Sequence, residues 1–268
     1  MKISFLKPKK SLGQNFLIDN NILKKIVTTT KVEESNILEI GGGEGALTKF
    51  ILMENPKSIT VIEKDKYLYH LLSKKFHNKK NVKILKGDIL KFHFDDYLSK
   101  NSIIFGNLPY NISTKIFTNL ITKISWPPRY KSLILMFQKE VGEKIIAKFK
   151  TKNYGRLSLL SNFRLDVLNK FIVSRNCFFP KPKVDSMVIH FKPKKNNKFE
   201  IKEIKNIEKI SNIFFSKRRK MINKSMNKLF NNPEKIYKSI KISPNNRPSD
   251  INDYQFFQLI EAYEKEGN

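Results

Sequence analysis

The stretch NILEIGGGEGALT, residues 36–48, decides the fold. Its first five residues form a short apolar run of the kind that makes a buried strand. A glycine-rich turn follows, after which Leu47, Phe50 and Ile51 recur at helical spacing. Strand, glycine turn and helix in this order are typical of the nucleotide-binding start of a doubly wound α/β domain. Because glycine has no Cβ atom, the backbone of the turn can approach a ligand closely.

Acidic residues end the next two predicted strands. Residues 58–63 form an apolar run that closes with Glu63, about 20 residues after the glycine turn, where an acid can bind both hydroxyls of a ribose. Residues 82–86 form a third run, followed by Gly87 and Asp88. Asp88 can accept a hydrogen bond from the adenine amine of a cofactor, although an ordinary turn aspartate gives the same pattern. These spacings favour a nucleoside ligand.

The glycine turn differs from the fingerprint of dinucleotide-binding proteins. Position 46, three residues beyond Gly43, is alanine where that fingerprint has glycine, and Glu39 and Glu44 flank the turn. A pyrophosphate needs free N–H groups with no opposing charge. Acids at this place suit a cation, such as a sulfonium with an ammonium tail.

A second motif, GNLPYNIS at residues 106–113, follows a short apolar strand and precedes a helical pattern. The side-chain oxygen of Asn107 and the carbonyl of Leu108 can accept the two N–H groups of an exocyclic amine such as that of adenine. Pro109 fixes the backbone and has no N–H to compete, and Tyr110 offers a flat face for stacking. The motif therefore suits transfer to an aromatic amine. The competing interpretation is a plain turn with a surface tyrosine.

The amino-acid composition indicates which classes of binding partner and which compartment suit this protein. The 268 residues include 52 Lys and Arg against 24 Asp and Glu, a formal charge of +28, which favours a polyanion such as nucleic acid. The chain is also rich in Lys, Asn and Ile, a bias that an A/T-rich genome produces, so charge alone establishes no partner. The single cysteine, Cys177, indicates a reducing compartment. With no signal peptide or membrane span in the sequence, we expect a cytoplasmic protein. The four histidines lack metal-ligand spacing, so we expect no metal.

Taken together, the motifs resemble the ribosomal RNA adenine dimethyltransferase family, and among its members most closely those of the small subunit. The likeness runs from about Leu12 to Arg247, with the motifs in the family's order. The segments that carry it are residues 12–17, 38–48, 87–88, 106–113, 154–158, 178–186 and 217–221. One departure is Gly42, where the family usually has proline, and we expect it to loosen the loop without removing a contact.

The resemblance implies S-adenosylmethionine as methyl donor and two adjacent adenosines in the 3′-terminal hairpin loop of 16S rRNA as target, each dimethylated, with a role in small-subunit biogenesis. It also implies that Phe178 faces the target base opposite Tyr110, although core packing is a fair competitor for Phe178. The catalytic residues are then Asn107, Leu108, Pro109, Tyr110 and Phe178. The residues that it implies for the cofactor are Asn15, Leu17, Gly41, Gly43, Glu63, Asp88 and Asn107.

The expected architecture is a Rossmann-like class I methyltransferase with a mixed seven-stranded sheet, followed by a small all-α domain. Residues 1–193 form the catalytic domain with a basic N-terminal arm, and residues 194–268, which show only helical patterns, form the second domain. Residues 132–138 make a central strand, and 163–167 and 187–191 a late antiparallel pair.

Two groups of cations are expected to contact RNA. One lies in a stiff proline-rich loop and the other on a helix of the second domain. Their members are Lys181, Lys183, Lys217, Arg218, Arg219 and Lys220. A solvated basic surface is the competing interpretation for the second group, and nothing in the sequence demands more than a monomer.

Three other functions share some of these features. A large-subunit rRNA adenine methyltransferase of the antibiotic-resistance type has the same core, and the two differ in the helical domain. A non-catalytic ribosome assembly factor could keep the fold, although the intact turn at residues 106–110 argues for chemistry. A nicotinamide oxidoreductase is suggested by the glycine turn alone.

Overall fold

The computed structural model describes residue 9, residues 13–195 and residues 198–267. The chain forms two compact units. The first comprises Met1–Gly142 and Val167–Pro193, and the second Glu143–Asp166 and Lys194–Asn268. The second unit therefore begins in the chain before residue 194, because residues 143–166 pack with the C-terminal helices.

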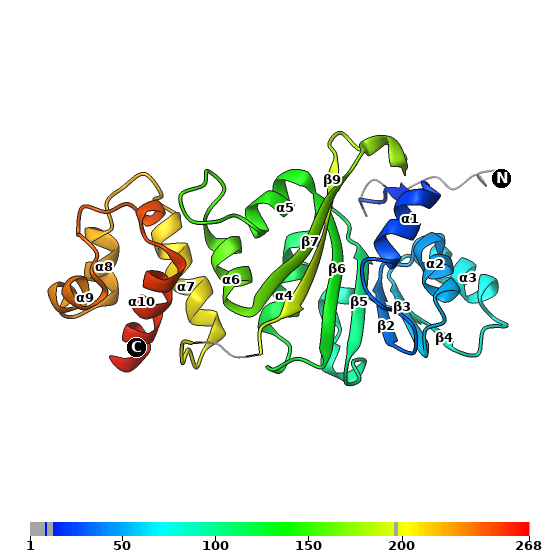
Figure 1. Ribbon diagram of the computed structural model, residues 1–268, viewed down its shortest axis with the longest axis horizontal. Helices are drawn as coiled ribbons and strands as arrows, with labels where there is room; N and C mark the ends of the chain where they lie inside the picture. The colour runs from blue at the N-terminus through cyan, green and yellow to red at the C-terminus, as the bar shows by residue number, and fades with distance from the viewer. Residues whose placement is uncertain (1–8, 10–12, 196–197, 268) are drawn as a thin grey trace. The chain divides into compact units, whose positions relative to one another are not determined.

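A mixed seven-stranded sheet forms the centre of the first unit, in the order β4-β3-β2-β5-β6-β9-β7 (Figure 1). Strands β4, β3, β2, β5 and β6 are parallel, and β9 is antiparallel to β6. This confirms the predicted fold class. The strands are β2 (Asn36–Ile40), β3 (Ser58–Glu63), β4 (Val82–Lys86), β5 (Ser102–Asn107), β6 (Tyr130–Gln138), β7 (Leu165–Val173) and β9 (Ser186–Pro193).

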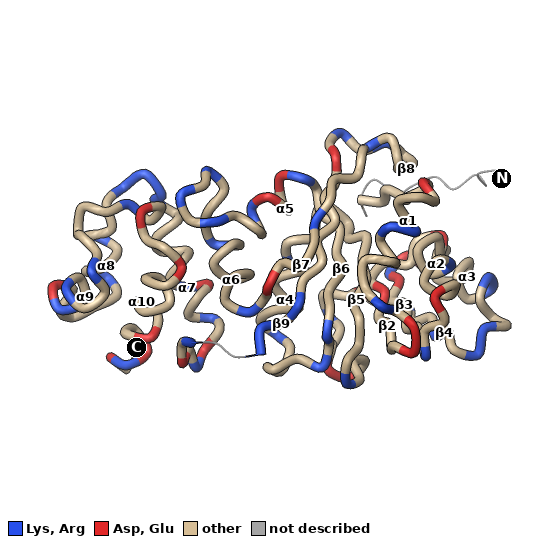
Figure 2. Tube along the Cα trace, viewed as in Figure 1, with Lys and Arg blue, Asp and Glu red and all other residues tan. Residues whose placement is uncertain are grey.

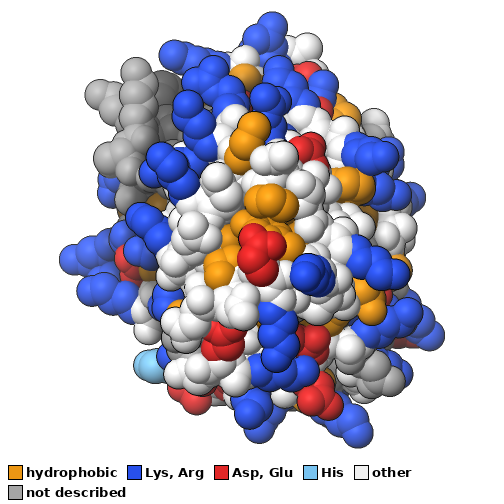
Figure 3. Space-filling view, turned by 90° about the vertical axis from the view of Figure 1, so that its left-hand side faces the viewer, with side chains coloured by type: hydrophobic (Ala, Val, Ile, Leu, Met, Phe, Trp, Pro, Cys, Tyr) orange, Lys and Arg blue, Asp and Glu red, His pale blue; other side chains and the backbone are white. Residues whose placement is uncertain are grey.

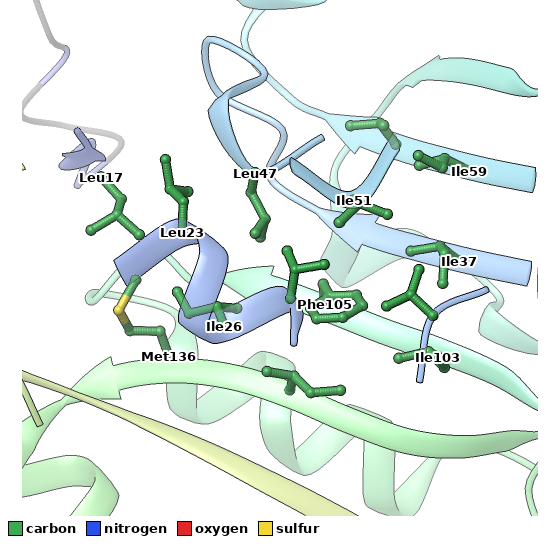
Figure 4. Packing of buried hydrophobic residues seen from close by; sticks show 14 of the residues in the cluster. Leu17, Leu23, Ile26, Ile37, Leu47, Ile51, Ile59, Ile103, Phe105 and Met136 are labelled. Atoms are coloured by element: carbon green, nitrogen blue, oxygen red, sulfur yellow. The ribbon is translucent and has the colours of Figure 1, made fainter. Parts of the chain in front are cut away.

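Helices cover both faces of this sheet, which explains why its central strands are apolar throughout. On one face, helices α1, α2 and α3 pack against strand residues such as Ile37 and Phe105 (Figure 4). On the other face, Phe117 of α4 contacts the rings of Phe137 and Phe191. The helices of this unit are α1 (Asn20–Val27), α2 (Ala46–Met53), α3 (Lys66–Lys75), α4 (Ser113–Thr122) and the start of α5 (Lys139–Ile145).

A separate two-stranded ribbon connects the two chain segments that make up the first unit. Strand β1 (Phe16–Leu17) pairs antiparallel with β8 (Phe178–Phe179), with Phe16 opposite Phe179 and Leu17 opposite Phe178. The side chains of Leu17 and Phe178 enter the same buried cluster as α1 and α2. The ribbon therefore fixes the N-terminal segment against the β7–β9 connection.

The second unit is helical, as the sequence predicts for residues after 194. Its helices are α6 (Arg156–Arg164), α7 (Ile204–Phe215), α8 (Asn223–Leu229), α9 (Pro233–Ile240) and α10 (Asp253–Lys265). The prediction of a strand over 163–167 is wrong at its start, because Phe163 and Arg164 end α6 and β7 begins at Leu165. Phe163 packs on Phe257 in this unit, and that contact favours the helix over the local β propensity.

No helix among the described residues combines the length and the apolar character needed to cross a bilayer. Within the same residues, no group of three or more His, Cys, Asp or Glu side chains is placed to hold a metal ion.

Candidate cofactor and target-base site

A pocket opens at the carboxyl ends of the central parallel strands. Strand β2 pairs with both β3 and β5, and the register places Ile40 beside Ile62 and Gly106. The glycine turn after β2 and the turn after β5 therefore begin side by side. Ten predicted site residues line this one pocket: Asn15, Leu17, Gly41, Gly43, Glu63, Asp88, Asn107, Leu108, Pro109 and Tyr110.

The glycine turn needs its glycines for two different reasons. Gly41 and Gly43 adopt φ values of +76° and +55°, in the left-handed region that L side chains rarely occupy. Gly42 has no such constraint, but a Cβ atom there would lie 2.4 Å from Cγ1 of Val61. The expectation that Gly42 loosens the turn is therefore incomplete, because in this chain Val61 takes the space that a side chain would need.

Glu63 holds the turn from the neighbouring strand. Its Oε2 accepts from the backbone N–H of Gly43 at 3.0 Å, and its Oε1 accepts from that of Asp65 at 2.8 Å. Burial raises the pKa of this carboxyl. An ionised carboxylate has about four acceptor positions, so Glu63 can hold the turn and still accept from a ribose hydroxyl.

Asp88 stands at the end of β4 with its charge compensated. Its Oδ2 lies 2.9 Å from Nζ of Lys64, and its Oδ1 accepts from the backbone N–H of Leu90 at 3.0 Å. The hydrogen bond from Lys64 lowers the pKa of Asp88. Asp88 is therefore an ionised acceptor at the rim of the pocket.

Glu39 is the most deeply buried acid that lines the pocket, with 1% of its surface exposed. Its Oε2 accepts from the hydroxyl of Thr48 at 2.6 Å. Burial raises the pKa of Glu39 to about 8, and the nearby carboxyl of Glu63 acts in the same direction. The sequence places Glu39 beside the glycine turn, but only the fold shows that its carboxyl is desolvated.

The turn after β5 holds its amide and its ring through long-range contacts. Nδ2 of Asn107 donates to the backbone carbonyl of Asn15 at 3.0 Å, so the opposite side of the amide presents the acceptor Oδ1. The hydroxyl oxygen of Tyr110 lies 2.5 Å from Oγ of Ser186, and burial raises the pKa of this phenol. Sequence reasoning assigns no role to Ser186, because 76 residues separate it from Tyr110 and no local pattern links them.

The structure places Phe178 in the core and not in the pocket lining, and its expected role opposite the target base stays a prediction. Its side chain is 3% exposed, belongs to the buried cluster and does not line the pocket. Pairing with Leu17 turns Phe178 inward, so the core-packing alternative describes what is seen. The neighbouring ring of Phe179 is 43% exposed.

The predicted RNA-contacting cations fall in both units. Lys181 and Lys183 are exposed on the segment between β8 and β9, where Figure 2 shows blue positions. In the second unit, residues 217–220 form a turn after α7 rather than part of a helix, and Arg218 donates to the carbonyl of Thr151 at 3.5 Å. Lys and Arg side chains gather at the upper margin of the face in Figure 3. The structure thus leaves both groups accessible to a polyanion.

A family model described as "Ribosomal RNA adenine dimethylase" matches residues 5–265. The chain belongs to this family. It is 45% identical over 260 residues to the ribosomal RNA small subunit methyltransferase A of Pelagibacter ubique, covering 97% of this chain and 98% of the relative. The protein of that name from Malacoplasma penetrans is 37% identical, with 96% and 94% covered.

A solved structure agrees with this assignment. The dimethyladenosine transferase from Plasmodium falciparum is 27% identical, covers 94% of this chain and 98% of its own, and superposes with a TM-score of 0.76. The 23S rRNA methyltransferase ErmE, at 22% identity and a TM-score of 0.66, shares the fold. The family predicted from the motifs is confirmed, and the protein is an rRNA adenine methyltransferase, which excludes the oxidoreductase alternative.

Proposed function

We propose that this dimethylase transfers methyl groups from S-adenosylmethionine to the exocyclic amines of two adjacent adenosines in the 3′-terminal hairpin loop of 16S rRNA. Each becomes N6-dimethyladenosine during assembly of the small subunit. One observation carries the proposal. The register of β2 against β5 joins the glycine turn and the Asn107 turn in a single pocket, so donor and acceptor can meet there.

The residues of the pocket fit a cationic nucleoside donor. The carboxyls of Glu39 and Glu63 line a partly desolvated bay, and because burial raises the pKa of both, a positively charged ligand bound beside them would favour their ionised forms. Glu63 would hold the ribose hydroxyls, Asp88 the adenine amine, and the backbone of Gly41 and Gly43 would let the ligand lie close. When bound, the donor supplies an electrophilic methyl group that needs no metal to activate it.

Asn107 and Leu108 would orient the target amine. Oδ1 of Asn107 and the backbone carbonyl of Leu108 accept its two N–H groups, which localises the nitrogen lone pair and aims it at the donor. The bond from Nδ2 to Asn15 fixes the amide in the orientation that this role requires. Tyr110, held by Ser186, would stack on the base. Catalysis is then mainly positioning and exclusion of water.

The exposed cations would hold the RNA backbone by charge, and hairpin loops offer unpaired bases that can enter such a pocket. We propose that Lys181, Lys183 and the turn at residues 217–220 make these contacts. We also propose that the protein acts on its rRNA as a monomer in the cytoplasm. The curated relatives named above carry the small-subunit name, and this favours 16S over 23S rRNA as target.

The test is incubation of the protein with a labelled methyl donor and unmethylated small subunits, with large subunits in a parallel reaction. Nucleoside mapping should place the label on two adjacent adenosines near the 3′ end of 16S rRNA. Label on 23S rRNA alone would instead support the resistance-type activity. Tight binding to small subunits without transfer would support the assembly-factor alternative.

A further inference from the structure

The β1–β8 ribbon presents two aromatic rings on the face that is turned away from the core. Residues directly opposite each other in an antiparallel pair project to the same side, with Cβ atoms about 5 Å apart. Leu17 and Phe178 form the buried pair. Phe16 and Phe179 therefore lie together on the opposite face of the ribbon.

This outward face begins at the pocket. Phe16 lines the pocket, and its ring approaches the glycine turn so closely that a Cβ atom on Gly43 would lie 3.2 Å from Cδ1 of Phe16. The residue before it, Asn15, accepts the hydrogen bond from the Asn107 amide. Successive contacts therefore connect the amine-binding turn to an exposed ring. They run from Asn107 through Asn15 and Phe16 to Phe179.

The segment that carries Phe179 is also attached to the amine-binding turn at its far end, where Ser186 contacts Tyr110. Between these two points the segment exposes cations. Lys181 and Lys183 are exposed, and Arg175, also exposed, donates to the carbonyl of Lys183 at 3.2 Å. An accessible aromatic ring among cations is the composition of surfaces that bind single-stranded nucleic acid, where bases stack on rings and phosphates pair with charge.

We propose that the ring of Phe179 stacks on the unpaired nucleotide next to the adenosine held by Asn107, an inference that rests on the proposed function. Since the two target adenosines are adjacent, this nucleotide is the second adenosine of the pair while the first is methylated. Phe179 is then a positioning residue for RNA. It touches the neighbour of the reacting base and keeps that neighbour from stacking back on it.

A matched pair of variants tests the proposal. Phe179→Ala removes the ring, and Val184→Ala trims an apolar side chain of the same segment that is equally exposed, at 43%. Base–aromatic stacking is strong enough for Phe179→Ala to raise the KM for small subunits roughly tenfold or more. Val184→Ala should change this KM less than about twofold. Phe179→Tyr, which keeps a ring, should restore the wild-type KM.

Two further readouts separate stacking from damage to the pocket. The Kd for S-adenosylmethionine and the thermal midpoint of Phe179→Ala should match those of Val184→Ala, because neither side chain is in the core. Equal KM values for the two alanine variants, or a Phe179→Tyr variant as impaired as Phe179→Ala, would overturn the proposal. Failure of the proposed function would look different, since wild-type protein would then leave 16S rRNA unmethylated.

Discussion

Replacing the buried carboxyl of Glu39 by an amide should change how stability depends on pH. Glu39 has an ordinary pKa of 4.5 when exposed and a pKa of about 8 in the fold. Between these two pH values the folded protein binds a proton that the unfolded chain has released, so stability falls as pH rises. The loss is complete once the pH passes about 8. The amide of Glu39→Gln can still accept from Thr48 and has no charge to desolvate.

The size of the effect follows from the same pKa values. A rise from 4.5 to about 8 corresponds to at most about 5 kcal/mol, since relaxation around the carboxylate reduces the cost. The groups that face Glu39 from neighbouring elements are Glu63 of β3, Thr48 of α2 and Lys75 of α3. Of these, the carboxyl of Glu63 raises the pKa, while the Thr48 hydroxyl and the Lys75 ammonium lower it, and burial exceeds all three.

The assay is the thermal midpoint of wild type and Glu39→Gln between pH 4 and pH 9. The two curves should converge below pH 4.5 and separate above it, with the variant more stable by several degrees at pH 8. Glu44→Gln, on the same loop but less buried, serves as control and should follow wild type. A constant offset between Glu39→Gln and wild type across this range would refute the reasoning, because the stability difference would then not come from ionisation.

Three further substitutions test the pocket. Asn107→Ala should lower the single-turnover methylation rate about 10²- to 10³-fold, because it removes a positioned hydrogen-bonding group. Circular dichroism should show an intact fold. A wild-type rate would remove Asn107 from the mechanism. Glu63→Ala should weaken binding of S-adenosylmethionine measured by calorimetry and leave the affinity for small subunits within about twofold, and unchanged cofactor affinity would contradict the role of Glu63. Gly42→Ala should cost about 1–3 kcal/mol in denaturant unfolding because its Cβ meets Val61, and a neutral result would show that Val61 moves aside freely.

Much of the fold could be predicted from the spacing of apolar residues, because its strands are buried on both faces and are separated by strong turn residues. Strand β3 has the predicted bounds, and the short strand expected before residue 106 is β5, which continues through Asn107. The prediction of a strand at residue 163 is wrong because the packing of Phe163 against Phe257 favours a helix there. The pocket was predictable because each of its segments follows a strand, and parallel strands end at one edge of a sheet.

Contacts between segments that are far apart in the chain could not be predicted from the sequence. The pairing of Phe178 with Leu17, across 161 positions, decides which of two adjacent phenylalanines is buried, and no local pattern distinguishes them. The same holds for Ser186 against Tyr110. The desolvation of Glu39 likewise depends on tertiary packing, which buries its carboxyl beside Thr48 of α2 and Glu63 of β3.

The central claim is that Asn107 presents an adenine amine to a methyl donor held on the adjoining glycine turn. The most direct measurement is quantitative nucleoside analysis of 16S rRNA after wild-type and Asn107→Ala proteins have each acted on unmethylated small subunits with labelled S-adenosylmethionine. The account predicts two adjacent N6-dimethyladenosines with wild type and almost none with the variant. Label on another base or at another atom of adenine with wild type, or equal dimethylation by both proteins, would contradict it.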